Sequence, residues 1–364
     1  MEIDIIGLPK SGKTTLFNAL THGKAETAAY ATGDLEPNIG VVKVPDPRLE
    51  VLARIFKPKK VTHAEVRYID LAGGGYTKGA GFSSQYTSYL TRADLLLHLV
   101  RAFTDPGVPH IEGSVDPARD IEAIDLELAF TDLALLEKRL QRIGDTLKGA
   151  KASERDAYLK EQALLERMRA QLEEGTLIRE QSFTEDEAKA LANYQFLTSK
   201  PMLIVLNLGE KQLPEAAALE EEYRSRFGRP DQGVAALCAK LEMELSQLGD
   251  AEAQEFRSDM GLAEPGLDRV IGISYALLGL ISFLTGGPDE VRAWTIHQGT
   301  IAQKAAGKIH SDIERGFIRA EVVHFDDLMR MGSMAEAKKH GLVRLEGKTY
   351  VVRDGDVMNV LFNV

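Results

Sequence analysis

The sequence predicts an α/β protein: a parallel sheet, interrupted by a helical arm and followed by a smaller β-rich domain. Strand-like and helix-like segments alternate from Glu2 to about Phe103. Apolar residues then recur at spacings of three and four between Asp120 and Leu172, and short β-like pieces return after Gly286. These patterns are typical of βα units, of a pair of packed helices and of a separate C-terminal domain.

The βα units follow one another closely along the chain. A short apolar strand precedes a helical pattern, and the later strands are alternating or continuously apolar, as parallel strands covered on both faces are. The predicted strands are residues 2–6, 38–46, 64–72, 93–102 and 200–207, with a helix over 12–21 and a further strand and helix within 234–248.

The arm falls between two of these strands. Its two helical segments are joined by a polar stretch from Lys148 to Asp156, which indicates an antiparallel hairpin. We expect the hairpin to project, because its apolar stripes are narrow and its other faces are charged; the alternative is two helices packed flat on the sheet. The predicted domains are residues 1–117 with 197–285, the arm 118–196, and the β-rich domain 286–364.

The composition is that of an ordinary globular protein, with 44% hydrophobic and 27% charged residues. No secretory signal is visible, and the longest apolar run, near residues 275–284, is too short to cross a bilayer. Cys238 is the only cysteine, so no intrachain disulfide can form. We therefore expect a cytoplasmic monomer without a membrane partner. The net charge of −11 argues against a generally basic surface that coats nucleic acid.

A phosphate-binding motif opens the chain. Residues Gly7–Thr14, GLPKSGKT, fit G-x-x-x-x-G-K-[ST] and lie between a predicted strand and a predicted helix, as the motif requires. Its glycines let backbone N–H groups face a phosphate, and the helix N-terminus favours an anion. Lys13 should reach the β- and γ-phosphates, and the Thr14 hydroxyl should bind Mg²⁺. The first domain is therefore predicted to be a P-loop nucleoside triphosphatase.

A second motif, D-x-x-G, supports the first. Asp70 ends an apolar strand, where its carboxylate can hold Mg²⁺, and the Gly73 N–H can sense the γ-phosphate. Gly74 stands where Ras-type enzymes place a water-orienting Gln, so the usual water-positioning group is missing. The glycine-rich stretch 73–81 suits a nucleotide-dependent switch, unless it is an ordinary surface loop.

The stretch NLGE, residues 207–210, ends a strand where guanine-specific proteins of the Ras type have Asn-Lys-x-Asp. The aspartate of that motif accepts hydrogen bonds from guanine N1–H and the N2 amino group, whereas adenine has an acceptor at N1 and no N2 amino group. Glu210 is longer, and Leu208 replaces the lysine whose stem covers the base, so guanine discrimination should weaken. We therefore expect ATP to bind better than GTP.

With these motifs, the chain resembles the YchF family of Obg-like ATPases along nearly its whole length, from Ile5 to Val364. The matching stretches include GLPKSGKTTLFNALT, EPNIGVVKVPDPRL, DLAG, DPARDIEAIDLELAFTDLALLEKRL, NLGE, VRAWTIHQGTIAQKAAGKIHSDIERGFIRAEVVHFDDL and YVVRDGDVMNVLFNV. The resemblance implies a nucleotide-binding domain, an inserted coiled coil and a C-terminal TGS domain of β-grasp fold. It also implies Mg²⁺-dependent ATP hydrolysis, preferred over GTP hydrolysis, and association with ribosomes.

The resemblance also implies site residues, position by position. Those implied to contact the phosphates are Lys10, Ser11, Gly12, Lys13, Thr14 and Thr15, and those implied near the base are Asn207, Leu208, Glu210, Cys238, Ala239 and Lys240. His110, in PHIEGSVDP, matches a histidine of the family's loop before the coiled coil. It could orient the attacking water if that loop folds over the γ-phosphate; the alternative is a surface histidine.

Two positions depart from the family's pattern. Asp34 stands where the family has a Mg²⁺-binding Thr. Its carboxylate could replace that ligand, and so could Thr32, but a negative charge beside the γ-phosphate could weaken ATP binding. Lys10 stands where the family commonly has Asn, which in related proteins helps to hold K⁺ against the phosphates. Either the Lys10 ammonium takes over that region and makes hydrolysis little dependent on K⁺, or it points into solvent.

The motifs and the resemblance together predict a Mg²⁺-dependent ATPase that acts as a ribosome-associated switch. A GTPase of the same class and a nucleotide-gated, ribosome- or RNA-binding protein with negligible turnover are the alternatives. The stretch Lys138–Lys151 has five basic residues against Asp145 near the expected tip of the arm, where it could reach rRNA phosphates. A solvated helix face is the plainer interpretation, and the TGS domain is the other candidate for RNA contact.

Overall fold

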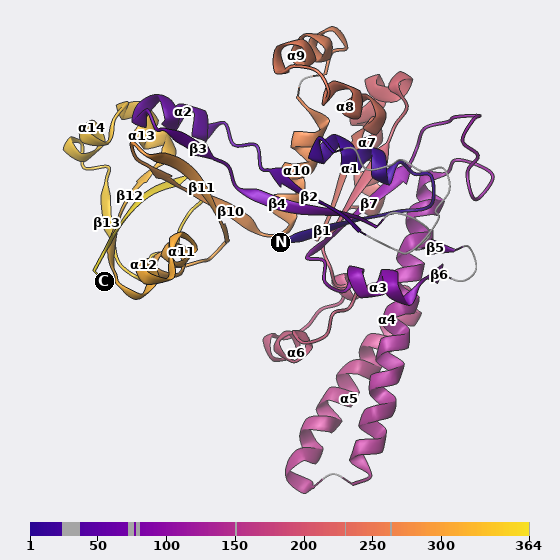
Figure 1. Ribbon diagram of the computed structural model, residues 1–364. Coiled ribbons are helices and arrows are strands. Elements are labelled where there is room, and N and C mark those ends of the chain that lie inside the picture. Colours follow the sequence, from indigo (N-terminus) through magenta and orange to yellow (C-terminus); the bar gives the residue numbers. More distant parts are fainter. Residues whose placement is uncertain are drawn as a thin grey trace. The chain divides into compact units, whose positions relative to one another are not determined.

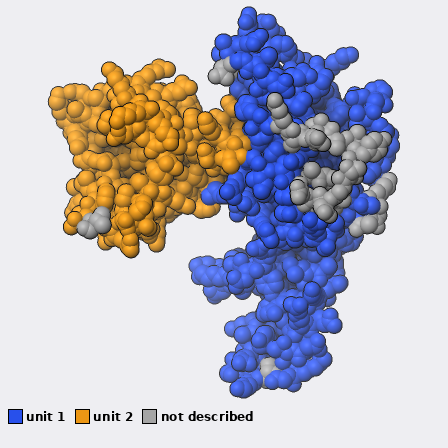
Figure 2. Space-filling view, in the orientation of Figure 1, with its two compact units in different colours: residues 1–40, 67–267 blue, residues 41–66, 268–364 orange. Residues whose placement is uncertain are grey.

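The computed structural model describes residues 1–23, 37–71, 76–77, 81–149, 151–229, 231–262 and 264–363. The chain divides into two compact units, residues 1–40 with 67–267 and residues 41–66 with 268–364 (Figure 2). Each unit combines helices with a sheet, so the predicted α/β class is confirmed. Thr32, Asp34, Gly73 and Gly74 lie outside the described residues, and their roles stay predictions.

The first unit is built on a sheet with the strand order β2-β4-β1-β7-β8-β9 (Figure 1). Neighbouring strands from β4 to β9 run parallel, as the βα pattern predicts. The strands are β1 (Glu2–Ile6), β2 (Pro37–Lys43), β4 (Glu65–Leu71), β7 (Leu95–Arg101), β8 (Met202–Asn207) and β9 (Gln232–Leu237). β7 and β8 are buried along their whole length, which explains why their sequences are continuously apolar.

Helices cover both faces of this sheet. An apolar cluster joins one face to α3, α4 and α7 through side chains such as Ile6, Leu90, Ile124 and Leu206. The helices of this unit are α1 (Lys13–Thr21), α3 (Ser84–Leu90), α4 (Pro117–Leu147), α5 (Ala152–Glu173), α6 (Glu185–Leu191), α7 (Ala216–Phe227), α8 (Ala239–Leu245) and α9 (Asp250–Asp259). α10 (Gly266–Leu277) leads into the second unit. Across the described ranges, no helix is long and apolar enough to cross a membrane.

The arm begins in a helix, α4, whose first turns pack on the sheet. α4 runs unbroken for 31 residues, which at 1.5 Å per residue is roughly 46 Å. Its first turns bury Ile121 and Ile124 in the cluster over the sheet. Its later turns bury Leu136 and Ile143 in a second cluster, shared with α5 residues such as Met168. α4 and α5 lie side by side and extend away from the sheet (Figure 1), so the predicted hairpin forms; its assignment as a coiled coil stays a prediction.

A buried carboxylate fixes the root of the arm. Asp132 of α4 is 1% exposed and accepts hydrogen bonds from the N–H groups of Leu197 and Thr198, both at 2.8 Å, and from the Thr198 hydroxyl at 2.7 Å. Burial raises the pKa of Asp132, although these donors oppose the shift. The returning chain is therefore tied to α4 just before it enters β8.

Asp132→Ala should destabilise the protein strongly for this reason. It leaves buried N–H donors without an acceptor, which costs on the order of 3 kcal/mol in the free energy of unfolding. Urea unfolding followed by circular dichroism measures the change. Glu137→Ala, at an exposed position of the same helix, is the matched control and should shift stability by less than about 0.5 kcal/mol. Equal effects of the two substitutions would contradict this account.

The second unit is built on a mixed sheet with the order β13-β12-β14-β10-β11-β3. Its strands are β3 (Lys60–Thr62), β10 (Leu280–Gly286), β11 (Glu290–His297), β12 (Phe317–His324), β13 (Arg344–Glu346) and β14 (Asp356–Phe362). Its helices are α2 (Arg48–Phe56), α11 (Ala302–Ile309), α12 (Ser311–Arg315), α13 (Phe325–Met331) and α14 (Met334–Lys339). α11 buries its alanines against Phe283 and Phe317 of the sheet. The finer assignment as a TGS domain stays a prediction.

The unit boundaries differ from the predicted domain boundaries. β10 begins at Leu280, before the predicted start of the last domain at residue 286, yet it pairs with β11 along its whole length. Residues 41–66, predicted to belong to the first domain, supply β3 and α2 to the second. Leu49 and Leu52 of α2 are fully buried, and Phe56 lies so close to Gly286 that a Cβ there would be 2.4 Å from its ring. These contacts join distant parts of the chain, which local periodicity cannot show.

Candidate nucleotide site

The loop between β1 and α1 turns sharply, and glycines occupy its tightest positions. Gly7 and Gly12 have backbone φ values of 146° and 100°, which residues other than glycine rarely adopt. A Cβ at Gly12 would lie 2.5 Å from Nδ2 of Asn207, and one at Gly7 would lie 2.3 Å from the carbonyl oxygen of Leu99. The chain therefore forms the strand–loop–helix turn that the phosphate motif requires.

Lys10 lies on this loop in a left-handed conformation, with φ of 66°. Asparagine tolerates that region better than lysine does, because its short side chain can hydrogen-bond locally. The side chain of Lys10 is exposed, whereas Ser11 is buried. Lys10 therefore places an exposed cation at the edge of the loop, in a backbone conformation that costs lysine some strain.

Lys13 is held inside the loop by backbone carbonyls. Its ammonium donates hydrogen bonds to the carbonyl oxygens of Gly7 at 2.9 Å and Leu8 at 3.2 Å. Burial lowers the pKa of Lys13, and the nearby charge of Asp70 partly opposes that shift. A desolvated ammonium at this position acts more strongly on a phosphate than one in water would.

Thr14 and Asp70 meet at the expected metal position. The Thr14 hydroxyl donates to Oδ2 of Asp70 at 2.8 Å, and Nδ2 of Asn38 lies 3.4 Å from the same oxygen. Asp70 is fully buried, and within the described residues its other oxygen, Oδ1, has no hydrogen-bond partner. A hydroxyl beside an unsatisfied buried carboxylate oxygen is a donor set that suits Mg²⁺, which takes few protein ligands together with phosphate oxygens and water.

Asn207 connects the phosphate loop to the start of α8. Its Nδ2 donates to the carbonyl oxygen of Ser11 at 2.8 Å, and its Oδ1 accepts from the N–H of Ala239 at 3.0 Å. Asn207 is buried, so its amide is used within the protein. Leu208, expected beside the base, is 1% exposed and packs in the apolar cluster over the sheet.

Two exposed charged residues lie in the segments expected beside the base: Glu210, shortly after β8, and Lys240, in the first turn of α8. Their side chains are 49% and 66% exposed, and Nζ of Lys240 lies 3.2 Å from Oε1 of Glu210. Cys238 between these loops is buried, and burial raises the pKa of its thiol. The carboxylate that would read a guanine is therefore already paired with an ammonium.

The structure places His110 in a buried pair. Its Nε2 lies 2.9 Å from Oδ2 of Asp120, and both side chains are 3% exposed. Its Nδ1 accepts from the N–H of Glu112 at 3.1 Å, and Arg119 donates to the other oxygen of Asp120 at 2.7 Å. His110 is therefore not a surface histidine. Both ring nitrogens are engaged, so it must leave Asp120 before it can contact water.

Sequence reasoning did not single out two of these residues. Asn38 lies in EPNIG and Asp120 in DPARD, two stretches that match the family, but the resemblance implies no role for either side chain. Their contacts with Asp70 and His110 form only when the chain folds. The sequence feature that could have identified both residues is their polar character within stretches that match the family.

Comparisons with known proteins agree with this geometry. A family model described as a 50S ribosome-binding GTPase matches residues 2–140. A second model, YchF-GTPase_C, described as a protein of unknown function, matches residues 280–363. The two matches cover the phosphate loop with part of the arm, and the sheet of the second unit.

Curated relatives match over nearly the whole length. The chain is 43% identical to the ribosome-binding ATPase YchF of Bacillus subtilis, over 99% of this chain and 98% of that protein. It is 42% identical to the protein of the same name from Haemophilus ducreyi, over the same shares. The solved structure of the Schizosaccharomyces pombe YchF GTPase superposes with a TM-score of 0.86 at 31% identity, over 99% of this chain and 97% of that one. With full-length identity at this level, the chain belongs to the YchF family of P-loop nucleoside triphosphatases.

Proposed function

We propose that this chain is a Mg²⁺-dependent ATPase that prefers ATP to GTP and acts as a nucleotide-dependent switch on the ribosome. The observation that carries the hydrolase assignment is the joint placement of Lys13, Thr14 and Asp70 around one phosphate-binding turn. The ribosome enters because the curated relatives are named as ribosome-binding ATPases. Switching rests on the stretch 73–81, of which residues 73–75 and 78–80 lie outside the described residues.

In the proposed mechanism, the loop's backbone N–H groups and Lys13 hold the β- and γ-phosphates. Thr14 and Asp70 would hold Mg²⁺, which neutralises charge that develops on the transferred phosphoryl group. Asn207 keeps the phosphate loop and the base loop in register through its two hydrogen bonds. Because the protein forms no covalent bond to the transferred phosphoryl group, most of the catalysis comes from this positioning and from electrostatic stabilisation.

The pair Glu210–Lys240 supports the preference for ATP. Guanine needs the Glu210 carboxylate as an acceptor, so its binding competes with Lys240, whereas adenine makes no such demand. Calorimetric titration of nucleotide-free protein with ATP and with GTP, in Mg²⁺, should therefore give tighter ATP binding. Tighter GTP binding would make the chain a GTPase of the same class.

Lys240→Ala should reduce the difference between the affinities for ATP and for GTP. The exposed pair is worth about 1 kcal/mol at most, so freeing Glu210 should improve GTP binding up to about fivefold and change ATP binding little. Lys211→Ala, at a neighbouring exposed lysine, is the matched control. If the ratio of the two affinities does not move in Lys240→Ala, the ion pair has no part in base selection.

We infer that His110 contributes to hydrolysis after it leaves Asp120. His110→Ala should lower kcat for ATP about tenfold, less than a permanently placed acid–base group would, because the pair with Asp120 must first open. Asp120→Asn keeps the shape of the side chain but weakens its interaction with His110. This variant should hydrolyse ATP at least as fast as the parent. An unchanged kcat in His110→Ala, with an unchanged unfolding midpoint, removes the catalytic role.

A further inference from the structure

β7 ends in a buried cation, Arg101, which is not among the residues expected to hold the phosphates and Mg²⁺. Arg101 is 2% exposed. Burial lowers the pKa of its guanidinium, and the charges of Asp105 and Asp120 oppose that shift. Within the described residues Arg101 forms no ion pair, and its Nη1 has no hydrogen-bond partner. Burying a charge without a countercharge is costly, so a function for Arg101 would explain its presence at this position.

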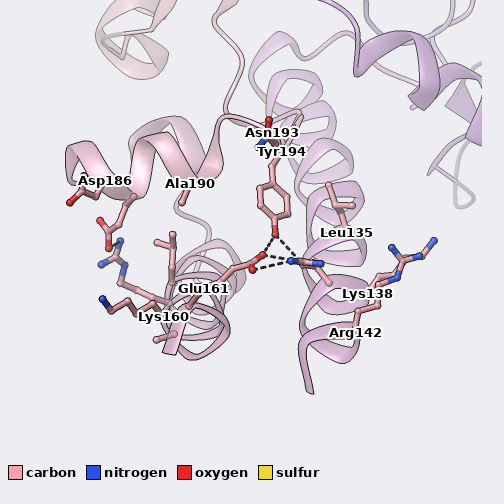
Figure 3. Close-up of a pocket in the computed structure, with 15 residues that line it drawn as sticks. Leu135, Lys138, Arg142, Lys160, Glu161, Asp186, Ala190, Asn193 and Tyr194 are labelled. Atoms are coloured by element: carbon pink, nitrogen blue, oxygen red, sulfur yellow. Dashed lines mark hydrogen bonds and ion pairs between the residues drawn. The ribbon is translucent and has the colours of Figure 1, made fainter. Parts of the chain in front are cut away.

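An arginine of the arm shows how a carboxylate satisfies a guanidinium elsewhere in the chain. Arg139 lies in a groove between α4, α5 and α6 (Figure 3). It donates to both oxygens of Glu161 at 2.8 and 2.9 Å and to the Tyr194 hydroxyl at 3.0 Å. The charges of this pair balance each other. Arg101 has no such carboxylate, and its donors serve the backbone instead.

The chain that follows β7 folds around the Arg101 guanidinium. Nη2 of Arg101 donates to the carbonyl oxygen of Val108 at 2.7 Å, and Nε donates to that of Phe103 at 3.2 Å. The Phe103 ring covers the guanidinium, with its centroid 4.4 Å from Cζ. The N–H of Val108 donates to the carbonyl oxygen of Asp105 at 3.1 Å and closes the turn. One side chain therefore holds the backbone at both ends of residues 103–108.

This anchor restricts the segment that carries His110. Val108 lies two residues before His110, so while Val108 is held the two Cα atoms stay within roughly 7 Å of each other. Without Arg101, the next fixed point is Phe103, seven residues before His110, whose N–H donates to the carbonyl oxygen of Asn207 at 3.1 Å. The entropic cost of bringing the end of a flexible segment to one place rises with the logarithm of its length, so this lengthening would make a given position of His110 about sixfold less populated.

We propose that Arg101 is a positioning residue for ATP hydrolysis, which fixes the turn at Val108 and so limits how far His110 can travel after it leaves Asp120. The proposal rests on the proposed catalytic role of His110. Arg101 is the register partner of Asn207, whose side chain binds the phosphate loop. The same end of the sheet therefore holds both the phosphate loop and the start of the segment that carries His110.

The test is a double-mutant cycle between Arg101→Met and His110→Ala. Methionine keeps an apolar stem beneath Phe103 and removes every donor of the guanidinium. For the parent, both single variants and the double variant, kcat, ATP affinity and the unfolding midpoint are measured. Hydrogen exchange followed by mass spectrometry compares residues 104–108 with β7. Arg139→Met is the matched control, because it removes an arginine that holds a hydrogen-bonded network remote in sequence from the His110 segment.

Arg101→Met should lower kcat about sixfold, with ATP affinity unchanged. Residues 104–108 should exchange faster, while β7 exchanges as in the parent. In the His110→Ala background the same substitution should change kcat by less than about twofold, because the group that it positions is absent. Arg139→Met should leave kcat unchanged in both backgrounds, even where it lowers the unfolding midpoint.

An unchanged kcat in Arg101→Met overturns the proposal. An equal loss of kcat in both backgrounds also overturns it, since Arg101 would then act independently of His110. A loss of ATP affinity at constant kcat would assign Arg101 to nucleotide binding through Phe103 instead. If His110→Ala alone keeps the parent's kcat, it is the proposed role of His110 that fails.

Faster exchange throughout β7 in Arg101→Met would mean that the substitution disturbs the sheet as well as the turn. Arg101→Lys, which keeps a cation and a donor for Val108, then takes its place in the cycle. A smaller loss of kcat that disappears in the His110→Ala background supports the proposal, and a loss of equal size in both backgrounds contradicts it.

Discussion

Lys13→Ala is expected to lower kcat for ATP hydrolysis by at least about 100-fold, the usual cost of removing one preorganised charge from a transition state. The side chain is fixed by the carbonyl oxygens of Gly7 and Leu8 inside the loop, so little reorganisation is needed when charge develops on the phosphate. Steady-state kinetics with ATP measures kcat and KM, and calorimetry measures ATP affinity separately.

Lys10→Ala is the matched control for this experiment. It removes a lysine from the same loop, but one whose side chain is exposed. The resemblance implies that Lys10 contacts the phosphates, but its side chain is exposed in this structure, so we expect its removal to keep kcat within a few-fold of the parent. The substitution should not relieve backbone strain, because alanine is also strained at φ of 66°. If both variants lose activity to the same extent, loop integrity explains the effect and not the Lys13 charge. If Lys13→Ala keeps more than about a fifth of the parent's kcat, the proposed role is wrong.

The phosphate site could be predicted from sequence because its determinants are local. Gly7, Gly12, Lys13 and Thr14 lie within one turn, and the strand and helix that hold them have clear apolar patterns. The role of each residue follows from its side-chain chemistry and from its position within the motif. The same holds for α4, whose spacing of apolar residues persists through two successive cores.

Features that depend on which side chains meet in the folded chain could not be predicted in this way. The burial of His110 needs Asp120, a residue that the apolar pattern of α4 gives no reason to single out. Leu208 was expected beside the base because lysine lies there in guanine-specific proteins, but a leucine after a buried strand packs into the apolar cluster. Residues 41–66 join the second unit through tertiary contacts alone. The polar or apolar character of a side chain is known from the sequence, but the residue that it contacts in the folded chain is not.

Asp4 is a buried carboxylic acid that lowers the stability of the folded protein when it is ionised. It lies in the middle of β1, between Ile69 of β4 and Leu96 of β7, and is 1% exposed. Neither carboxylate oxygen has a hydrogen-bond partner in the described parts of the chain. Burial, with smaller contributions from Glu2 and Asp94 against that of Lys200, raises the pKa of Asp4 from 3.8 to about 7. The folded state therefore favours the neutral acid.

Asp4→Asn should stabilise the protein at pH 8 and leave its stability nearly unchanged at pH 4. Because the folded pKa lies above the unfolded one, the folded state binds more protons between those values, and stability falls as pH rises through that window. Above about pH 7 the folded protein must bury a charge that the unfolded chain exposes to water. At 1.36 kcal/mol per pKa unit, the cost that asparagine removes is at most about 4 kcal/mol.

Urea unfolding of parent and Asp4→Asn at pH 4, 6 and 8 measures this difference, and comparison at each pH cancels the titration of all other groups. Asp186→Asn, at an exposed carboxylate, controls for the loss of one negative charge from an acidic chain. The gain in Asp4→Asn should grow steadily with pH and exceed that of the control most at pH 8. A gain that does not change with pH would mean that Asp4 is solvated or paired in the folded protein, and that β1 carries no buried charge at neutral pH.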